Sequence, residues 1–110
     1  MIDIKIPVDI IENENSFIVI ADLPGVNKED IQITGSESSI TIKALRKSLE
    51  NGKYLIVERF SGVIVRTIKF KEYIDIARSK GVLENGVLKI YIPKAKNHFI
   101  IDSCFQIIVL

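Results

Sequence analysis

The sequence is poor in the residues that build redox, metal and stacking sites. Its 110 residues include one cysteine, one histidine and no tryptophan. Cys104 on its own cannot form an internal disulfide, and with His98 as the single imidazole it cannot complete a structural zinc site. We therefore expect a free thiol at Cys104, and we interpret its nearness to His98 in the tail as incidental rather than catalytic.

An excess of charge of one sign is also absent. Fifteen Lys and Arg oppose fourteen Asp and Glu, which leaves a formal net charge of +1, and aromatic residues make up 7% of the chain. Nucleic-acid binding needs a basic field, and single strands also need aromatic side chains on which bases stack. We therefore do not expect nucleic acid as a partner.

Long apolar runs are missing as well. Charged residues interrupt the apolar stretches, and Met1 is followed by Asp3 and Lys5 instead of a hydrophobic signal segment. A membrane-spanning helix needs about 20 consecutive, mostly apolar residues. We expect a soluble, cytoplasmic protein that does not use a membrane as a partner.

No arrangement typical of catalysis stands out. An enzyme would need a nucleophile beside a base, a pair of poised carboxylates or a metal cluster. The glycines form no phosphate-binding motif, and carboxylates such as Glu12, Glu29 and Glu84 stand in turns or beside lysines, which is typical of a solvated rim. We expect no enzymatic activity, no cofactor and no metal.

What the sequence does contain is a regular alternation of branched aliphatic residues. At 47% hydrophobic and 26% charged, the chain suits one globular domain. The apolar positions recur with a period near two, which indicates strands. The predicted strands cover residues 8–11, 17–23, 30–34, 40–42, 54–58, 63–70, 81–83 and 87–92. With turn signals between them, such as Asn85-Gly86, they predict an all-β fold, an immunoglobulin-like antiparallel β-sandwich of seven to eight strands.

Three stretches need separate interpretation. Residues 45–53 are charged and contain an Asn-Gly pair, so we expect an exposed loop there. Residues 71–80 fit a helical turn or a loop with a few core anchors, and we favour the loop. Arg66 shares a strand face with Ile64 and Ile68, so its charge needs a partner or a route to water. We interpret Arg66 as an interface or structural ion-pair residue, with a role in a binding site as the alternative.

The amino-acid composition changes twice towards the end of the chain. Residues 94–97 are polar, as in a tether, and Phe105 to Leu110 are almost entirely apolar. Such an apolar segment is not expected to lie free in water. We predict one domain over residues 1–94 and a tail over residues 95–110.

Several segments together carry a resemblance to a known family. They are the opening Val8-Asp9-Ile10, the turn Asp22-Leu23-Pro24-Gly25-Val26 and the closing hairpin Glu84-Asn85-Gly86-Val87-Leu88. From about Pro7 to Lys94 the chain resembles the alpha-crystallin domain of small heat-shock proteins. The resemblance implies an ATP-independent chaperone, a holdase, that binds non-native client proteins and prevents their aggregation.

The resemblance also implies which residues make contacts between subunits. In the family, a strand in the long loop pairs with the neighbouring subunit, and an arginine on the following strand helps to hold the dimer. The matching positions are Tyr54, Leu55, Ile56, Val57, Glu58, Arg59 and Arg66. The family's C-terminal anchor, Ile-x-Ile/Val, adds as a strand to a partner's sheet, and Ile107-Ile108-Val109 has that spacing. The alternative is a tail that folds onto its own domain.

The sequence departs from the family pattern in several places, of which the start of the chain matters most. Only six residues precede Pro7, where family members usually carry a longer arm that drives large assemblies. We therefore expect a homodimer, with higher oligomers or mixed oligomers with longer relatives as further possibilities. Gly81 stands where the family usually has alanine, and Phe70-Lys71 stands where it usually has Leu-Pro; we expect neither change to affect the fold. A second hypothesis is a co-chaperone or assembly adaptor of the CS-domain type that binds one folded partner, but those domains lack the exchange loop.

Overall fold

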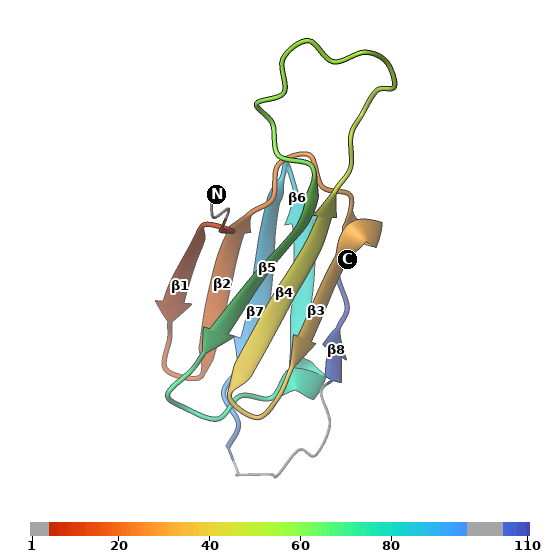
Figure 1. The fold of residues 1–110 in the computed structure, drawn as a ribbon. Helices are drawn as coiled ribbons and strands as arrows, with labels where there is room; N and C mark the ends of the chain where they lie inside the picture. Colours follow the sequence, from red (N-terminus) through yellow and green to blue (C-terminus); the bar gives the residue numbers. More distant parts are fainter. Residues whose placement is uncertain (1–4, 97–104) are drawn as a thin grey trace.

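The computed structural model describes residues 5–96 and 105–110. Within these residues, eight strands form two four-stranded antiparallel sheets, in the orders β1-β2-β7-β6 and β5-β4-β3-β8 (Figure 1). The elements are β1 (Val8–Glu12), β2 (Ser16–Asp22), η1 (Lys28–Asp30), β3 (Ile31–Gly35), β4 (Ser39–Arg46), β5 (Gly62–Lys69), η2 (Ile76–Arg78), β6 (Lys80–Glu84), β7 (Val87–Pro93) and β8 (Phe105–Ile107). The predicted antiparallel β-sandwich is confirmed.

The core lies between the two sheets and is built mainly from isoleucine. On β7, Leu88, Ile90 and Ile92 point inward with no exposed surface, while the intervening Lys89 and Tyr91 are exposed. Side chains alternate across a strand, so a period of two places one set of residues against the other sheet. Full burial of each such side chain stabilises the fold by roughly 1.5–3 kcal/mol.

The hairpin between β6 and β7 turns through Asn85 and Gly86. Both residues have positive φ, 54° and 76°, as the two central residues of a type I′ turn require. The Gly86 carbonyl accepts a hydrogen bond of 2.7 Å from the backbone N–H of Leu23, next to the Pro24-Gly25 turn. The two turns that carry the family resemblance therefore support each other at one end of the sandwich.

A charged cluster closes the opposite end. The Lys94 ammonium donates a 2.7 Å hydrogen bond to Glu12, lies 3.4 Å from a Glu72 oxygen, and sits 5.1 Å from the centre of the Phe17 ring. The hydrogen bond from Lys94, together with its charge, lowers the pKa of Glu12, and the same bond raises the pKa of Lys94. The cluster joins the end of β1 to the end of β7.

Two stretches between the strands differ in how well they were anticipated. Residues 71–79 form a loop that includes the single 3-10 turn η2 and inserts Ile74 and Ile76 into the core. The loop favoured over residues 71–80 is therefore confirmed except at Lys80, which begins β6. The expectation of a loop beginning at residue 45 is wrong by two residues, because Leu45 and Arg46 continue β4. The partners of these two residues on β5, Val63 and Gly62, extend the ladder that far.

Candidate functional site

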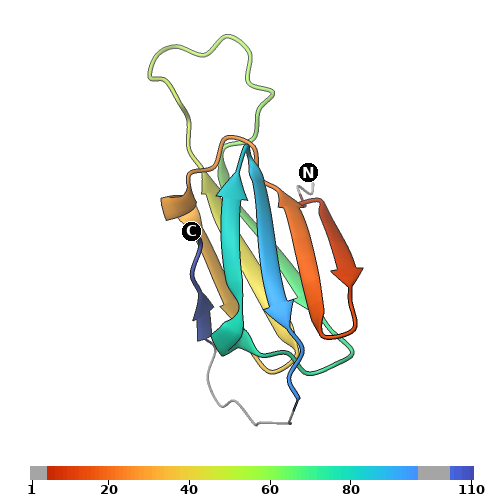
Figure 2. The same cartoon turned by 180° about the vertical axis from the view of Figure 1, so that it is seen from behind.

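The two sides of the sandwich differ in how their strand edges are covered. On one side, β1 and β5 are the last strands of their sheets, and no described strand pairs with their outer edges. On the other side, the end of the chain lies along both β3 and β6 (Figure 2). An uncovered edge presents unpaired N–H and C=O groups that can pair with another chain. The side of β1 and β5 is therefore the open side.

The described end of the tail, residues 105–110, contacts both sheets. As β8, residues Phe105–Ile107 pair antiparallel with β3, with Ile107 opposite Ile33. The next residues run beside β6. There the Gly81 N–H donates to the Ile108 carbonyl at 3.0 Å, and the Leu110 N–H donates to the Gly81 carbonyl at 2.7 Å. The tail thus bridges the two sheets and covers an edge of each.

The side chains of the tail alternate between the core and water. Ile107 is 2% exposed and belongs to the core cluster, and Val109 packs against that cluster, whereas Ile108 and Leu110 point outward. Of the two alternatives considered for the tail, the single chain shows the one in which it folds onto its own domain. Ile107 and Val109 occupy the space between β3 and β6.

Gly81 is the contact point of the tail on β6. A Cβ built on Gly81 would lie 3.4 Å from the Ile33 side chain, 3.5 Å from Leu88 and 3.6 Å from the Ile108 carbonyl. These distances are ordinary van der Waals contacts, so alanine would fit. The glycine therefore eases the approach of the tail without being required for it.

The long loop between β4 and β5 is the largest irregular feature. Figure 1 shows it extending beyond the end of the sandwich. The expected strand over Tyr54–Glu58 is not formed in the single chain, because no described strand lies beside this segment to complete its backbone hydrogen bonds. The neck of the loop is narrow, with Ser48 Oγ and Ser61 Oγ 3.4 Å apart.

The tip of the loop exposes consecutive apolar side chains. Leu55, Ile56 and Val57 are 86%, 76% and 70% exposed, and Tyr54 is half exposed. Residues of the loop also line an open pocket of about 530 Å³. Contiguous apolar surface of this kind marks contact sites in soluble proteins. The segment Tyr54–Val57 is hereafter called the apolar loop segment.

Two arginines lie at the base of this loop. A Cβ built on Gly25 would be 3.2 Å from Arg59 Nη2, so the Arg59 guanidinium lies against the Pro24-Gly25 turn. Arg46, at the end of β4, has a buried Nε without a hydrogen-bond partner among the described residues. Sequence reasoning missed Arg46. Its place in the inward-facing row of Ile42 and Ala44 was the available signal.

Arg66 lies on β5, on the open side. Its neighbours in the same row, Ile64 and Ile68, are buried, while Arg66 is half-buried and its Nη1 donates a 3.3 Å hydrogen bond to the Ile6 carbonyl. No ion pair within residues 5–96 and 105–110 includes Arg66. The described partner of its guanidinium is therefore a backbone carbonyl and not a carboxylate.

The free edge of β1 was not singled out by the sequence. Ile10 and Ile11 are on opposite faces of this strand, and both are nearly half exposed, at 47% and 44%. Beside them, Asp9 places a carboxylate on the strand, while Glu12 is paired with Lys94. The strand is five residues long, the same length as the segment Tyr54–Glu58.

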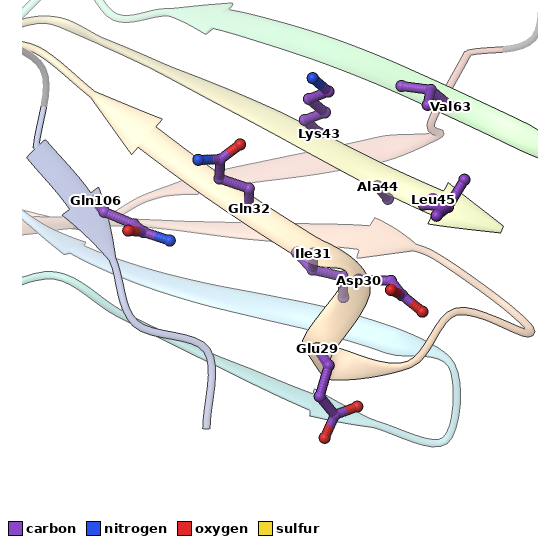
Figure 3. Close-up of a pocket in the computed structure, with 9 residues that line it drawn as sticks. All are labelled: Glu29, Asp30, Ile31, Gln32, Lys43, Ala44, Leu45, Val63 and Gln106. Carbon is purple, nitrogen blue, oxygen red and sulfur yellow. The ribbon is translucent and has the colours of Figure 1, made fainter.

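A shallow depression of about 320 Å³ lies on the outer face of β3 and β4 (Figure 3). Its polar groups do not converge on a point, since Glu29 is directed away from Gln32 and Lys43 (Figure 3). Asp30 is engaged at 3.2 Å by Lys47. The arrangement offers no nucleophile with a base at its side.

Other features bear on chemistry. No group of three or more metal-ligating side chains gathers in the part of the chain that the structure describes. Cys104 and His98 lie outside the described residues. None of the described helices has the length and apolar character needed to cross a membrane.

Comparison with known proteins agrees with this geometry. Residues 9–103 match the model of the Hsp20/alpha crystallin family. Among relatives, the 16.9 kDa class I heat shock protein 3 of Oryza sativa subsp. japonica is 36% identical over 93 residues, which are 81% of this chain and 62% of the rice protein. The 17.4 kDa class III heat shock protein of Arabidopsis thaliana is 34% identical over 99 residues, 82% of this chain and 64% of its own. The chain thus spans somewhat under two thirds of the length of these relatives.

Solved structures show the same fold. Heat shock protein 16.0 from Schizosaccharomyces pombe aligns with a TM-score of 0.74 at 28% identity, over 90% of this chain and 99% of that one. A small heat-shock protein from Xylella fastidiosa, described as having a distinct high order structure, aligns with a TM-score of 0.72 at 29% identity, over 93% and 98% of the two chains.

Proposed function

The chain belongs to the Hsp20/alpha crystallin family, and from this premise we propose that it is an ATP-independent holdase that binds non-native proteins and prevents their aggregation. The observation that carries the proposal is the apolar loop segment, in which Leu55, Ile56 and Val57 are largely exposed to water. Aliphatic side chains held at the surface cover apolar patches of an unfolding client, and this lowers the client's self-association.

The apolar loop segment, together with Glu58, also forms the homodimer. In the proposed dimer, Tyr54–Glu58 of one subunit adds as a strand to the free edge of β1 in the other, and strand addition satisfies the unpaired backbone groups of both. Charge supports the pairing through Asp9 of β1, because Lys53 and Arg59 flank the segment, whereas Glu12 at the end of β1 is already paired with Lys94. Arg66 lies on the same open side and secures the contact.

The tail gives the proposal a second contact. Ile107 and Val109 occupy the space between β3 and β6 within the chain. We propose that the same two side chains anchor to this space in another subunit when the tail leaves its own domain, as the family's Ile-x-Ile/Val pattern implies. Higher oligomers, and mixed oligomers with longer relatives, would form through this exchange, and the emptied groove would be open to a client segment.

The proposal includes no covalent chemistry. It places the protein in the cytoplasm, with non-native proteins and other subunits as partners, without a cofactor, and without nucleic acid or membrane as partners. The near-neutral formal charge of +1 supports the exclusion of nucleic acid.

The test is suppression of aggregation without nucleotide. A heat-aggregating enzyme is incubated with the protein at several molar ratios, and light scattering is followed against an inert control protein. We expect suppression near stoichiometric ratio. Unchanged scattering at large excess would refute the stand-alone holdase.

Matched variants separate the apolar loop segment from general loop hydrophobicity. Ile56→Ser removes an apolar side chain inside the segment, and Leu49→Ser removes one of similar exposure, 70% against 76%, earlier in the same loop. We expect Ile56→Ser to weaken both dimerisation and suppression, and Leu49→Ser to change neither by more than about twofold.

The rival function, a CS-type adaptor for one folded partner, predicts a different outcome. An adaptor would leave scattering unchanged for unrelated clients and would not depend on the apolar loop segment. The presence of a 15-residue stretch between β4 and β5, over residues 47–61, favours the chaperone, since CS-type domains lack this loop.

A further inference from the structure

The chain contains two Asn-Gly pairs in opposite structural settings. Asn51-Gly52 lies in the exposed loop, and Asn85-Gly86 lies in the tight turn between β6 and β7. We infer that Asn51 is a site of spontaneous deamidation, a slow chemical modification that introduces a negative charge into the loop. Asn85 has the same local sequence but is protected by its turn.

The reaction needs only the chain and water. The backbone nitrogen of Gly52 attacks the side-chain amide carbon of Asn51, a new C–N bond closes a succinimide ring, and ammonia leaves with the proton from the Gly52 nitrogen. Water then opens the ring at either carbonyl. The products are aspartate or isoaspartate at position 51, each carrying one new carboxylate. Glycine favours the attack because it has no Cβ to hinder the approach.

The setting of Asn51 allows this ring closure. Both Asn51 and Gly52 are exposed and belong to no strand or helix. A Cβ built on Gly52 would meet no atom within 4 Å, so the backbone there has open space on that side. Throughout the described part of the chain, no hydrogen bond is found to either residue. The two residues can therefore rotate into the geometry of attack without breaking a contact.

The setting of Asn85 opposes it. Asn85 and Gly86 are fixed at φ values of 54° and 76° between the paired residues Glu84 and Val87. The Gly86 carbonyl is hydrogen bonded, and a Cβ at Gly86 would lie 3.2 Å from the Pro24 backbone, so this turn is packed against its neighbour. Ring closure at Asn85 therefore requires the hairpin end to open first. The rate of deamidation at Asn85 is then proportional to the small fraction of molecules in which the hairpin end is open.

The new carboxylate has a consequence for self-association, and this part rests on the proposed exchange of the loop. Position 51 lies three residues before Tyr54 and next to Glu50, and the proposed acceptor edge on β1 carries the carboxylate of Asp9. A further negative charge opposes the pairing of loop and edge. For exposed charges, the expected effect is dimerisation that is weaker by about two- to fivefold at low salt, and by less at high salt.

Peptide mapping by mass spectrometry tests the modification itself. The native protein is incubated at neutral and at mildly alkaline pH, and the conversion of amide to acid is followed at both positions, with isoaspartyl methyltransferase labelling as a second readout. We expect Asn51 to convert at least about tenfold faster than Asn85, and faster at the higher pH, because the attacking nitrogen must lose its proton. Equal rates at the two positions, or a faster rate at Asn85, would overturn the inference.

Denaturant and substitution provide the controls. In concentrated urea, where the turn is lost, the two positions should convert at similar rates, and a persistent difference would show that the fold is not the cause. Gly52→Ala should slow conversion at Asn51 and leave Asn85 unchanged. If Gly52→Ala has no effect on the rate at Asn51, attack by this backbone nitrogen is refuted.

The consequence is tested separately by sedimentation of Asn51→Asp against Asn51→Gln. Weaker dimerisation of Asn51→Asp alone supports the effect of charge, and equal dimerisation of the two variants overturns it. If Ile56→Ser leaves dimerisation intact, the proposed loop exchange fails, while the modification of Asn51 is still judged by the peptide map.

Discussion

Replacement of Ile107 by alanine tests whether the tail is a structural part of the domain. Ile107 is 2% exposed, lies opposite Ile33 on β3 and belongs to the core cluster. Removal of three buried carbons from a core isoleucine costs about 2–5 kcal/mol of the free energy of unfolding. Since the site lies at a sheet edge, where the surroundings can relax, we expect a loss of about 2–3 kcal/mol.

The free energy of unfolding that Ile107→Ala can lose is limited by how strongly the tail is docked. If the tail undocks while the sandwich stays folded, the variant loses no more than the free energy with which the tail was docked. The matched control is Ile108→Ala, whose side chain is 69% exposed although it is the next residue. We expect this control to change the free energy of unfolding by less than about 0.5 kcal/mol.

Urea unfolding followed by circular dichroism, at several protein concentrations, is the assay. For Ile107→Ala we expect a fall in the urea midpoint, and in thermal melts a fall in Tm of roughly 10 °C. A contact within one chain makes this loss independent of protein concentration, whereas a contact between chains makes it grow with concentration. The reasoning is refuted if the Ile107 and Ile108 variants are equally stable at every concentration.

Three further predictions concern the ends and the open side of the sandwich. Lys94 lowers the pKa of Glu12 below its usual value of 4.5, so the ion pair stabilises the fold above that pH and its contribution is lost as the pH falls through the lowered pKa. The Tm difference between the native protein and Glu12→Gln should therefore shrink in acid, and a constant difference would contradict this. Gly86→Ala should lower the free energy of unfolding by about 1–3 kcal/mol, because φ of Gly86 is +76°. Gly81→Ala, at a site with room for a Cβ, should change it by less than about 1 kcal/mol, and chemical denaturation would measure both. Arg66→Met should weaken the dimer about tenfold or more in sedimentation experiments while lowering monomer stability by only about 1 kcal/mol, and an equally strong dimer would remove Arg66 from the interface.

Short stretches of the sequence are enough to predict the strands and turns of this protein. The alternation of Leu88, Ile90 and Ile92 with Lys89 and Tyr91 indicates both a strand and its buried face, because side chains on a strand point alternately to its two sides. The Asn85-Gly86 pair indicates the turn type, since positive φ at both positions favours these residues. Such signals act between neighbours in the chain, so the β-sandwich was predictable.

The interpretation of the long loop shows the limit of local signals. Tyr54–Glu58 has the composition of a strand, yet no strand forms there in the single chain. A strand needs a neighbour that completes its backbone hydrogen bonds, and composition does not say whether such a neighbour is within reach. Likewise, the sequence showed that Arg66 needed a partner but not that the partner was the Ile6 carbonyl, 60 residues earlier.

By itself, the sequence determined the all-β class, the main turns and the family, because periodicity, turn chemistry and motif all depend on residues close together in the chain. Only the tertiary structure decided which edges are open and which are covered. The tail pairs with β3 through Ile107 and with β6 at Gly81, and these contacts join positions far apart in the sequence that no local pattern specifies. The physical reason is that an apolar tail is driven to any groove that buries it, and the position of that groove exists only after the two sheets have packed.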